Sequence, residues 1–306
     1  MTDQMYVIVV MAPPGTLFNR MLIENAVSAV QGQVVEAHRV AVPVTLADHR
    51  EVSKFLIDCP DPERLSAQLR QLSDQYGADI ALQSRLSRCR PYGLAVFDMD
   101  STLISCEVID ELARVAGVGA EVAAITERAM RGELDFDESF RTRLALLEGL
   151  DAGAVDELAD QLPVQSGLSE MATTLKARGL RLAIFSGGFI PIAERLKNDY
   201  GFDHVVANGL EIRDGKVTGK IIPPIVNREY KAEALGALAS QLGIHTEHCI
   251  AVGDGANDLS MMALAGLGVA FHAKPAVRAA SPIEITHIGL DGVCYLMGHE
   301  GEFAAA

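Results

Sequence analysis

The chain has 306 residues, enough for two ordinary domains or for one large domain with an insertion. With 49% hydrophobic and 22% charged residues, the composition is that of a soluble globular protein, and intrinsic disorder is not expected. The 41 acidic residues outnumber the 26 basic ones, and the net charge of -15 argues against partners such as nucleic acid or an anionic membrane.

Residues 1–88 are expected to form a βαββαβ unit. The predicted strands are Tyr6–Met11, Val34–Val44, Val52–Asp58 and Ile80–Leu86, and the predicted helices are Leu17–Val30 and Pro62–Tyr76. This order predicts an α+β domain of ferredoxin-like type, with two helices on one face of an antiparallel sheet. The proline-containing segment Ser87–Tyr92 is interpreted as a linker.

From residue 89 to residue 306, strands alternate with helices, as in an α/β domain. The predicted strands are Leu94–Asp98, Leu182–Ser186, His204–Ala207, Cys249–Gly253 and Gly268–Phe271. Such alternation predicts a Rossmann-like, doubly wound parallel sheet. In addition, Asp214-Gly215 predicts a hairpin between Leu210–Arg213 and Lys216–Lys220.

Residues 106–165 interrupt this alternation, because they show helical patterns and no credible strand. We interpret them as a helical cap inserted after the first strand of the parallel sheet. The core would then comprise residues 89–105 and 166–306. Gly117, Gly132 and Gly149 are expected to end helices of the cap.

Three predicted parallel strands end in polar loops, FDMDST, FSGGF and VGDGAND. Parallel sheets bind ligands at the carboxyl ends of their strands, so Asp98, Asp100, Asp254 and Asp258 should meet in one crevice. Each pair of like charges about 4 Å apart costs on the order of 4 kcal/mol, and the four acids therefore need a cation. Oxygen ligands without His or Cys favour Mg²⁺, which keeps water molecules that a phosphate can replace.

Two further features would complement such a metal site. The backbone amides of Gly187 and Gly188 and the Ser186 hydroxyl could present donors to an anion close to the start of a helix near Phe189. Lys231, at the start of a later helix, could add a compact positive charge. These features predict a phosphate site beside the metal.

In order along the chain, DMDST, SGG, a single lysine and GDGANDLSM resemble the four motifs of the haloacid dehalogenase (HAD) superfamily. The longer stretch DMDSTLISCEVIDELA, followed by the cap, is similar to the phosphoserine phosphatases of that superfamily, over roughly residues 93–297. The resemblance implies Mg²⁺-dependent hydrolysis of O-phospho-L-serine through an aspartyl-phosphate intermediate. That reaction would be the last step of serine biosynthesis.

The resemblance also implies roles for individual residues. Asp98 would be the nucleophile, and Asp100 the general acid and base. The side chains of Asp98 and Asp254 and the backbone carbonyl of Asp100 would bind Mg²⁺. Asp258 and Asn257 would arrange the surrounding shell, and Asn257 is also expected at the substrate site.

The other substrate-binding positions that the resemblance implies are Ser186, Gly187 and Lys231 around the phosphoryl group, and Glu107, Arg143, Met130 and Phe136 in the cap. A zwitterionic amino acid needs one group of each sign, so Glu107 would bind the ammonium group and Arg143 the carboxylate. Met130 and Phe136 would close the pocket against water.

The N-terminal βαββαβ unit resembles amino-acid-sensing domains of the ACT type in the order and length of its elements. This resemblance implies L-serine as an effector. An exposed sheet edge would also allow a homodimer. A module that dimerises or stabilises the chain without binding a ligand remains the alternative.

The five cysteines (Cys59, Cys89, Cys106, Cys249, Cys294) are odd in number and include no CxxC pair, which predicts reduced thiols in the cytoplasm. The apolar run from Met5 to Ala12 meets Pro13-Pro14 and is too short for a membrane span. The residues before it lack the positive charge of a signal peptide. We therefore expect neither targeting nor anchoring.

Three alternative functions stay open. The chain could be a phosphatase or phosphotransferase for another small phosphomonoester, or an amino-acid-sensing regulator with a weakly active phosphatase domain. A dehalogenase is the third alternative. It is disfavoured because Asp100 would protonate a leaving group, which a halide does not require.

Overall fold

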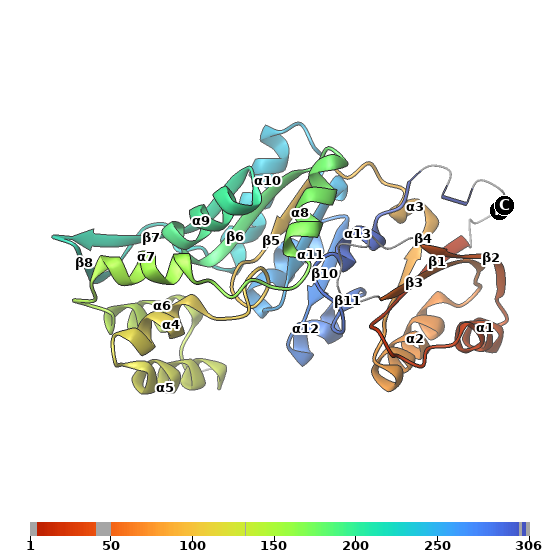
Figure 1. The fold of residues 1–306 in the computed structure, drawn as a ribbon, viewed down its shortest axis with the longest axis horizontal. Coiled ribbons are helices and arrows are strands. Elements are labelled where there is room, and N and C mark those ends of the chain that lie inside the picture. Colours follow the sequence, from red (N-terminus) through yellow and green to blue (C-terminus); the bar gives the residue numbers. More distant parts are fainter. Residues whose placement is uncertain (1–4, 41–49, 132, 300–301, 304–306) are drawn as a thin grey trace.

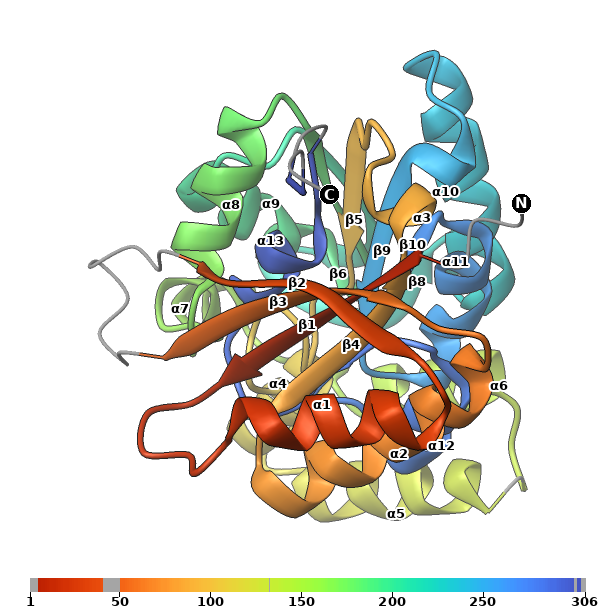
Figure 2. The ribbon, with the colours of Figure 1, turned by 90° about the vertical axis from the view of Figure 1, so that its right-hand side faces the viewer.

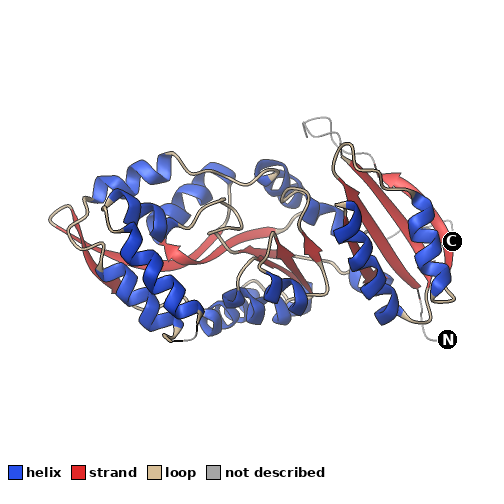
Figure 3. Cartoon of the chain, turned by 90° about the horizontal axis from the view of Figure 1, so that it is seen from below, coloured by secondary structure: helices blue, strands red, loops and turns tan. Residues whose placement is uncertain are grey.

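The computed structural model describes residues 5–40, 50–131, 133–299 and 302–303. Two parts lie side by side, a small antiparallel-sheet domain and a larger α/β domain (Figures 1 and 3). The doubly wound parallel sheet and the preceding βαββαβ unit that the sequence predicts are both confirmed.

The N-terminal domain is a four-stranded antiparallel sheet with the order β2-β3-β1-β4 (Figure 2). Its elements are β1 (Met5–Ala12), α1 (Arg20–Ala29), β2 (Gln33–Val40), β3 (Glu51–Asp58), α2 (Pro62–Tyr76) and β4 (Asp79–Ser84). In β1, Ile8 and Val10 pack with buried residues of α1 and α2. The alternate residues Val7 and Val9 belong to the core of the larger domain. Both faces of this sheet are therefore buried.

Element boundaries in this domain differ from the prediction where side chains cap helices. α1 begins at Arg20 rather than near Leu17, because the Asn19 side chain accepts the Met21 N–H. β4 ends at Ser84, whose hydroxyl accepts the Ser87 N–H and starts the short helix α3 (Arg85–Arg88). The predicted extension of the second strand, residues 41–44, lies outside the described residues.

The segment Ser87–Tyr92, interpreted as a linker between the two domains, is packed into the protein at Arg88 and Tyr92. Arg88 in this segment is fully buried. Its guanidinium donates to the backbone carbonyls of residues 295–297 and pairs with Glu302 at 2.7 Å. Because an unpaired buried charge is strongly destabilising, these partners hold the segment firmly against the C-terminal part of the chain.

Two more buried contacts fasten the domains together. The Asp79 carboxylate accepts the backbone N–H groups of residues 286–288 at 2.7 to 3.2 Å. Arg50 pairs with Asp291 at 2.7 Å, and both side chains are almost completely buried. The N-terminal domain is thus packed onto the larger domain.

The larger domain contains a seven-stranded sheet with the order β11-β10-β9-β5-β6-β7-β8. Its strands are β5 (Leu94–Phe97), β6 (Arg181–Phe189), β7 (His204–Arg213), β8 (Lys216–Ile222), β9 (Cys249–Gly253), β10 (Leu267–Phe271) and β11 (Glu284–Ile285). Neighbours from β11 to β7 are parallel, and β8 is antiparallel. Asp214 and Gly215 form the predicted hairpin turn with φ angles of 52° and 75°.

Strand β5 occupies the centre of the sheet, with β6 on one side and β9 on the other. The chain first builds the sheet outward through β6 and β7, and later returns to add β9 and β10 on the opposite side. The β5–β9 boundary is therefore the topological switch point, the place at which doubly wound sheets bind ligands.

Helices cover both faces of this sheet. They are α8 (Leu168–Ala177), α9 (Ile190–Tyr200), α10 (Arg228–Gln241), α11 (Leu259–Leu264), α12 (Pro275–Ala280) and α13 (Gly292–Leu296), with the 3₁₀ helices η1 (Thr246–His248) and η2 (Ala256–Asp258). Residues of α8, α9 and α13 share one apolar cluster with β5 and β6, and residues of α10 and α11 share the other. Among the described helices, none has the length and apolar run needed to cross a bilayer.

Four helices separate β5 from α8 and form the cap, at the lower left of Figure 1. They are α4 (Val108–Val115), α5 (Gly119–Met130), α6 (Phe136–Ala145) and α7 (Ala152–Asp160). Gly117 and Gly149 follow helices with φ angles of 75° and 87°, which fits their predicted role as helix ends. Gly132 lies outside the described residues.

The cap contacts the core at its two chain crossings and at a hairpin. Ile104 and Val164 form an antiparallel bridge between the crossings. The Gly149 N–H donates to the carbonyl of Val217 in β8, and the Val217 N–H donates to the Leu150 carbonyl, both at 2.8 Å. The β7–β8 hairpin is therefore bonded directly to the cap.

Candidate active site

Three strands bring the predicted motifs to one edge of the sheet. Phe97 at the end of β5 pairs with Ile184 of β6 and with Val252 of β9. The Asp98 N–H then donates to the Val252 carbonyl at 2.9 Å. The residues that follow each strand consequently lie side by side.

A group of buried carboxylates occupies this edge. Oxygen atoms of Asp98, Asp254 and Asp258 lie within 4.8 Å of one another. Lys231 of α10 lies between Asp98 and Asp258. Its Nζ is 2.7 Å from Asp98 Oδ1 and 2.7 Å from Asp258 Oδ1. Lys231 has no exposed surface, so its charge acts within a dry environment.

The two oxygens of Asp258 are both engaged within the protein. Oδ1 contacts Lys231, and Oδ2 accepts the Gly255 N–H at 3.0 Å. A Cβ at Gly253 would lie 2.4 Å from the Asp258 carboxyl carbon, so only glycine permits this close approach. Asp258 therefore orients Lys231 and the loop, and oxygens of Asp98 and Asp254 remain for a cation.

Asp100 is not part of this carboxylate group. Its Oδ1 is buried and has no hydrogen-bond partner among the described residues, and its Oδ2 approaches Gly188. The resemblance implied that Asp100 binds the metal through its backbone carbonyl, which leaves its side chain available for proton transfer. An orphaned buried oxygen at the site is consistent with such a role.

Burial and the neighbouring carboxylates raise the pKa values of three acids in this site, Asp98, Asp100 and Asp254. Burial raises the pKa of Asp98 to about 8; Asp258 and Asp254 reinforce the shift, and Lys231 opposes it. Burial, then Asp258, raises the pKa of Asp254 to about 6. Burial, Glu107 and Asp98 raise the pKa of Asp100 well above its ordinary value. Burial alone would lower the pKa of Lys231, but Asp258 and Asp98 raise it overall.

The Ser186–Gly188 segment leaves the regular strand register. The pairing of β6 with β7 shifts between Phe185 and Phe189. The Ser186 hydroxyl accepts the Gly188 N–H at 2.8 Å, so one of the two amides expected to face an anion is already engaged. A Cβ at Gly188 would lie 2.6 Å from the Met99 methyl group, so a larger residue here would require the Met99 side chain to move.

Asn208 is a site residue that the sequence reasoning missed. It lies in β7 and is fully buried. Its amide donates to the Gly187 carbonyl at 2.6 Å, and its oxygen accepts the Val226 N–H at 2.8 Å. It thereby ties the SGG segment to the chain that enters α10 and Lys231. The signal available in the sequence was an amide residue directly after the predicted strand His204–Ala207.

A cavity of about 430 Å³ lies between the core and the cap. Its lining includes Asp98, Asp100, Gly187, Asp254 and Asn257 from the core, and Glu107, Asp110, Phe136 and Arg143 from the cap. Ser186 and Lys231 are fully buried and do not line it. The side chain of Met130 lies outside the described part of the structure.

The cap supplies both charges and aromatic rings to this cavity. Burial lowers the pKa of Arg143, although Asp110, Glu107 and Asp100 act in the opposite direction. Phe136 stacks on Phe140 with their ring centres 6.3 Å apart. Phe140 in turn contacts Phe189 of the core at 6.0 Å, so aromatic contacts join the cap to the end of β6.

Known proteins resemble the chain in sequence and in structure. The family model described as haloacid dehalogenase-like hydrolase matches residues 95–263. Phosphoserine phosphatase SerB2 of Mycobacterium tuberculosis is 46% identical over 249 residues, which are 81% of this chain and 60% of that protein. Phosphoserine phosphatase of Haemophilus influenzae is 46% identical over 219 residues, which are 72% of this chain and 70% of that protein.

A solved structure matches nearly the whole fold. The crystal structure of a HAD family hydrolase from Salmonella enterica has a TM-score of 0.83 and 32% identity, and the match covers 96% of this chain and 99% of that one. The similarity therefore extends across the N-terminal sheet as well as the α/β domain. The chain nevertheless spans only 60% of the length of the mycobacterial relative.

The raised pKa values predict that the affinity of the carboxylate group for a divalent cation depends on pH, with Mg²⁺ as the probe. Below a pKa of about 8 for Asp98 and about 6 for Asp254, these carboxyl groups hold protons that a cation must displace. We expect the apparent Kd for Mg²⁺ at pH 6 to exceed that at pH 8 by roughly tenfold or more, with proton release on binding. Titration calorimetry in two buffers of different ionisation enthalpy measures both quantities.

The matched control for this titration is Asp110→Asn. Asp110 lines the same cavity but lies outside the carboxylate group, so its substitution should preserve the pH dependence. Equal Mg²⁺ affinity at pH 6 and pH 8, without proton release, would contradict the assignment of Asp98 and Asp254 as ligands of the cation.

Proposed function

The chain belongs to the haloacid dehalogenase-like hydrolase family, and from this premise we propose that it hydrolyses O-phospho-L-serine to L-serine and phosphate, the last step of serine biosynthesis. One observation carries the proposal. Glu107 and Arg143 line the same cavity as Asp98 and Asp100. A group of each sign, suited to a zwitterion, thus lies beside two acids suited to phosphoryl transfer. The relatives named phosphoserine phosphatase support the same substrate.

In the proposed reaction, an Asp98 carboxylate oxygen attacks phosphorus and the P–O bond to serine breaks. Asp100, whose raised pKa keeps a proton on its buried carboxyl group, transfers that proton to the departing serine oxygen. Asp100 then takes a proton from the water that attacks the aspartyl phosphate. This second step releases phosphate and restores the Asp98 carboxylate.

We assign the remaining core residues to charge balance around the phosphoryl group. Oxygens of Asp98 and Asp254 and the Asp100 carbonyl would hold Mg²⁺, and the all-oxygen donor set fits that ion. When bound, Mg²⁺ supplies positive charge against the phosphoryl oxygens. Ser186, Gly187, Lys231 and Asn257 would contact the phosphoryl group or orient the loops around it. Asp258 acts by holding Lys231.

The cap would recognise the serine part of the substrate. Glu107 would pair with the ammonium group, and Arg143 would offer its planar guanidinium to the carboxylate. Phe136, which reaches over Gly187 from the cap, would exclude water together with Met130. A phosphomonoester without these groups would lose both ionic contacts.

The substrate assignment predicts a selective defect in Arg143→Ala. We expect its kcat/KM for O-phospho-L-serine to fall on the order of 100-fold, because a charged, paired hydrogen bond is lost. Turnover of O-phosphoethanolamine, which lacks the carboxylate, should fall much less. The control is Arg141→Ala, an exposed arginine on the same helix.

Phosphate release from a panel that includes phosphothreonine and sugar phosphates, with and without EDTA, completes this test. Unchanged phosphoserine turnover by Arg143→Ala, or a preference of the unmodified protein for a sugar phosphate, would favour the alternative of another phosphomonoester substrate.

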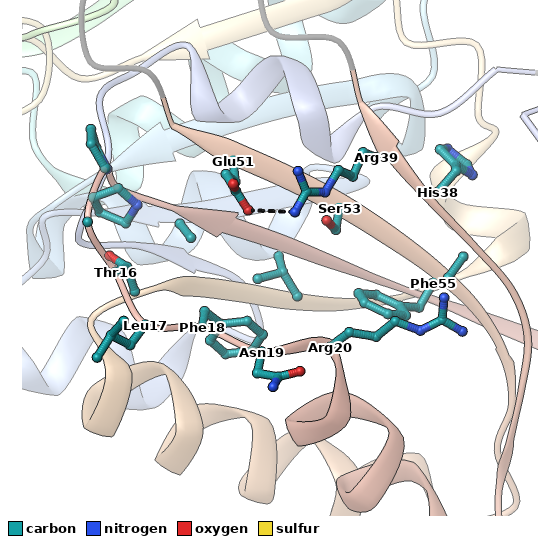
Figure 4. A pocket seen from close by; sticks show the side chains of 16 residues that line it. Thr16, Leu17, Phe18, Asn19, Arg20, His38, Arg39, Glu51, Ser53 and Phe55 are labelled. Carbon is teal, nitrogen blue, oxygen red and sulfur yellow. Dashed lines mark ion pairs between the residues drawn. The ribbon is translucent and has the colours of Figure 1, made fainter.

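We further propose that residues 1–88 form an ACT-like domain that binds L-serine as an effector. A cavity of about 900 Å³ lies between the β1–α1 loop and strands β2 and β3 (Figure 4). At its edge, Arg39 and Glu51 form a largely exposed ion pair with an N–O distance of 3.2 Å. An amino acid that displaced this exposed ion pair would bring its carboxylate to Arg39 and its ammonium group to Glu51. The outer edge of β2, which pairs with no other strand of the described residues, supports a homodimer.

Titration calorimetry with L-serine tests the effector proposal. Because L-serine is also the proposed product, the titration uses the Arg143→Ala background, in which binding at the catalytic cavity is weakened. We expect saturable heat of L-serine binding. Arg39→Ala should weaken the affinity for L-serine about tenfold, whereas Arg64→Ala, on the exposed surface of α2, should leave it unchanged. No heat and no effect of L-serine on activity would leave the domain as a dimerising or stabilising module.

We place the reaction in the cytoplasm. All five cysteines are free thiols in the structure, which suits a reducing compartment. Residues 89–306 would be the catalytic domain there, with the cap at residues 106–165.

A further inference from the structure

Ser101 has an unusual backbone conformation next to the proposed general acid. Its φ angle is 58°, in the left-handed region that non-glycine residues rarely adopt. Strain of this kind persists only where the surroundings enforce it, and it is concentrated at functional sites. Here the Ser101 N–H donates to the Cys106 carbonyl at 3.2 Å, and the resulting tight loop brings residue 107 back beside residue 101.

The loop places the Ser101 hydroxyl against the cap carboxylate. Ser101 Oγ donates to Glu107 Oε1 at 2.9 Å. Among the described residues, no other hydrogen bond to the Glu107 carboxylate is found, and Glu107 makes no side-chain cap at the start of α4. One oxygen of this carboxylate is thereby fixed, and the other remains free to bind a ligand.

The charges around Glu107 explain why such a restraint matters. Glu107 and Arg143 line one cavity and carry opposite charges. An ion pair between them would remove both recognition groups from use, yet none links these two described side chains within 4.0 Å. The hydroxyl of Ser101 holds Glu107 instead, and it also limits the rotamers of a long side chain before substrate arrives.

We propose that Ser101 is a positioning residue that orients the Glu107 carboxylate for the ammonium group of the substrate. This inference rests on the proposed function. Ser101 acts through Glu107: Glu107 lines the cavity, whereas Ser101 is not among the described residues that line it. It therefore determines specificity for an amino-bearing phosphomonoester.

The test compares O-phospho-L-serine with 3-phosphooxypropanoate, which is the same molecule without its amino group. The variant is Ser101→Gly, because glycine accepts the positive φ and the fold is preserved; Ser101→Ala serves as a second variant that also lacks the hydroxyl. We expect the ratio of kcat/KM for phosphoserine to that for the analogue to fall about tenfold, mainly through KM. Ser105→Ala, an exposed serine of the same loop, is the matched control.

A double mutant separates positioning from general disruption. In a Glu107→Ala background, Ser101→Gly should cause no further change in the ratio. An equal loss with both substrates, or an unchanged ratio in Ser101→Gly, would overturn the positioning role while leaving the proposed function in place. If the unmodified protein does not favour phosphoserine over the analogue, the proposed function and this inference both fail.

Discussion

Lys231 lies fully buried between two carboxylates, and the rest of the site depends on that charge balance. One lysine cannot neutralise three crowded acids, and the excess negative charge is what invites a divalent cation. Two asparagines fix the start of α10, the helix that carries Lys231. The Asn227 side chain caps α10, and Asn208 holds the preceding segment through Val226. The position of the Lys231 charge therefore depends on strand β7, which carries Asn208.

Chemistry and recognition are divided between the two parts of the larger domain. The core contributes the acids that we propose to act on phosphorus, and the cap contributes the groups that would identify the leaving group. Phe136, Phe140 and Phe189 join the two parts, and Asn227 at the start of α10 also donates to Asp137 of the cap at 3.2 Å. A movement of the cap would consequently disturb the contact between Asp137 and Asn227, at the start of the helix that carries Lys231.

Much of this organisation could be predicted from the sequence, because local patterns determine it. Strands that end in acidic or glycine-rich loops must meet at one edge of a parallel sheet, which brings Asp98 and Asp254 together. Long-range partners were not predictable. Arg88 reads as a linker residue until its carbonyl partners, more than 200 positions away, are known. The bonds of Asn208 span about 20 positions and the bond of Ser101 spans only six, but both depend on backbone geometry that residue types do not encode.

The central claim is that Asp98, the carboxylate paired with Lys231, becomes covalently bound to phosphorus during the reaction. The most direct measurement is an acid quench during turnover of O-phospho-L-serine labelled in its phosphoryl group, followed by peptide mapping. The account predicts a labelled aspartyl phosphate on the peptide that contains Asp98 and no label in Asp98→Asn. A label on a different residue, or turnover that leaves no labelled intermediate on the unmodified protein at any quench time, would contradict it.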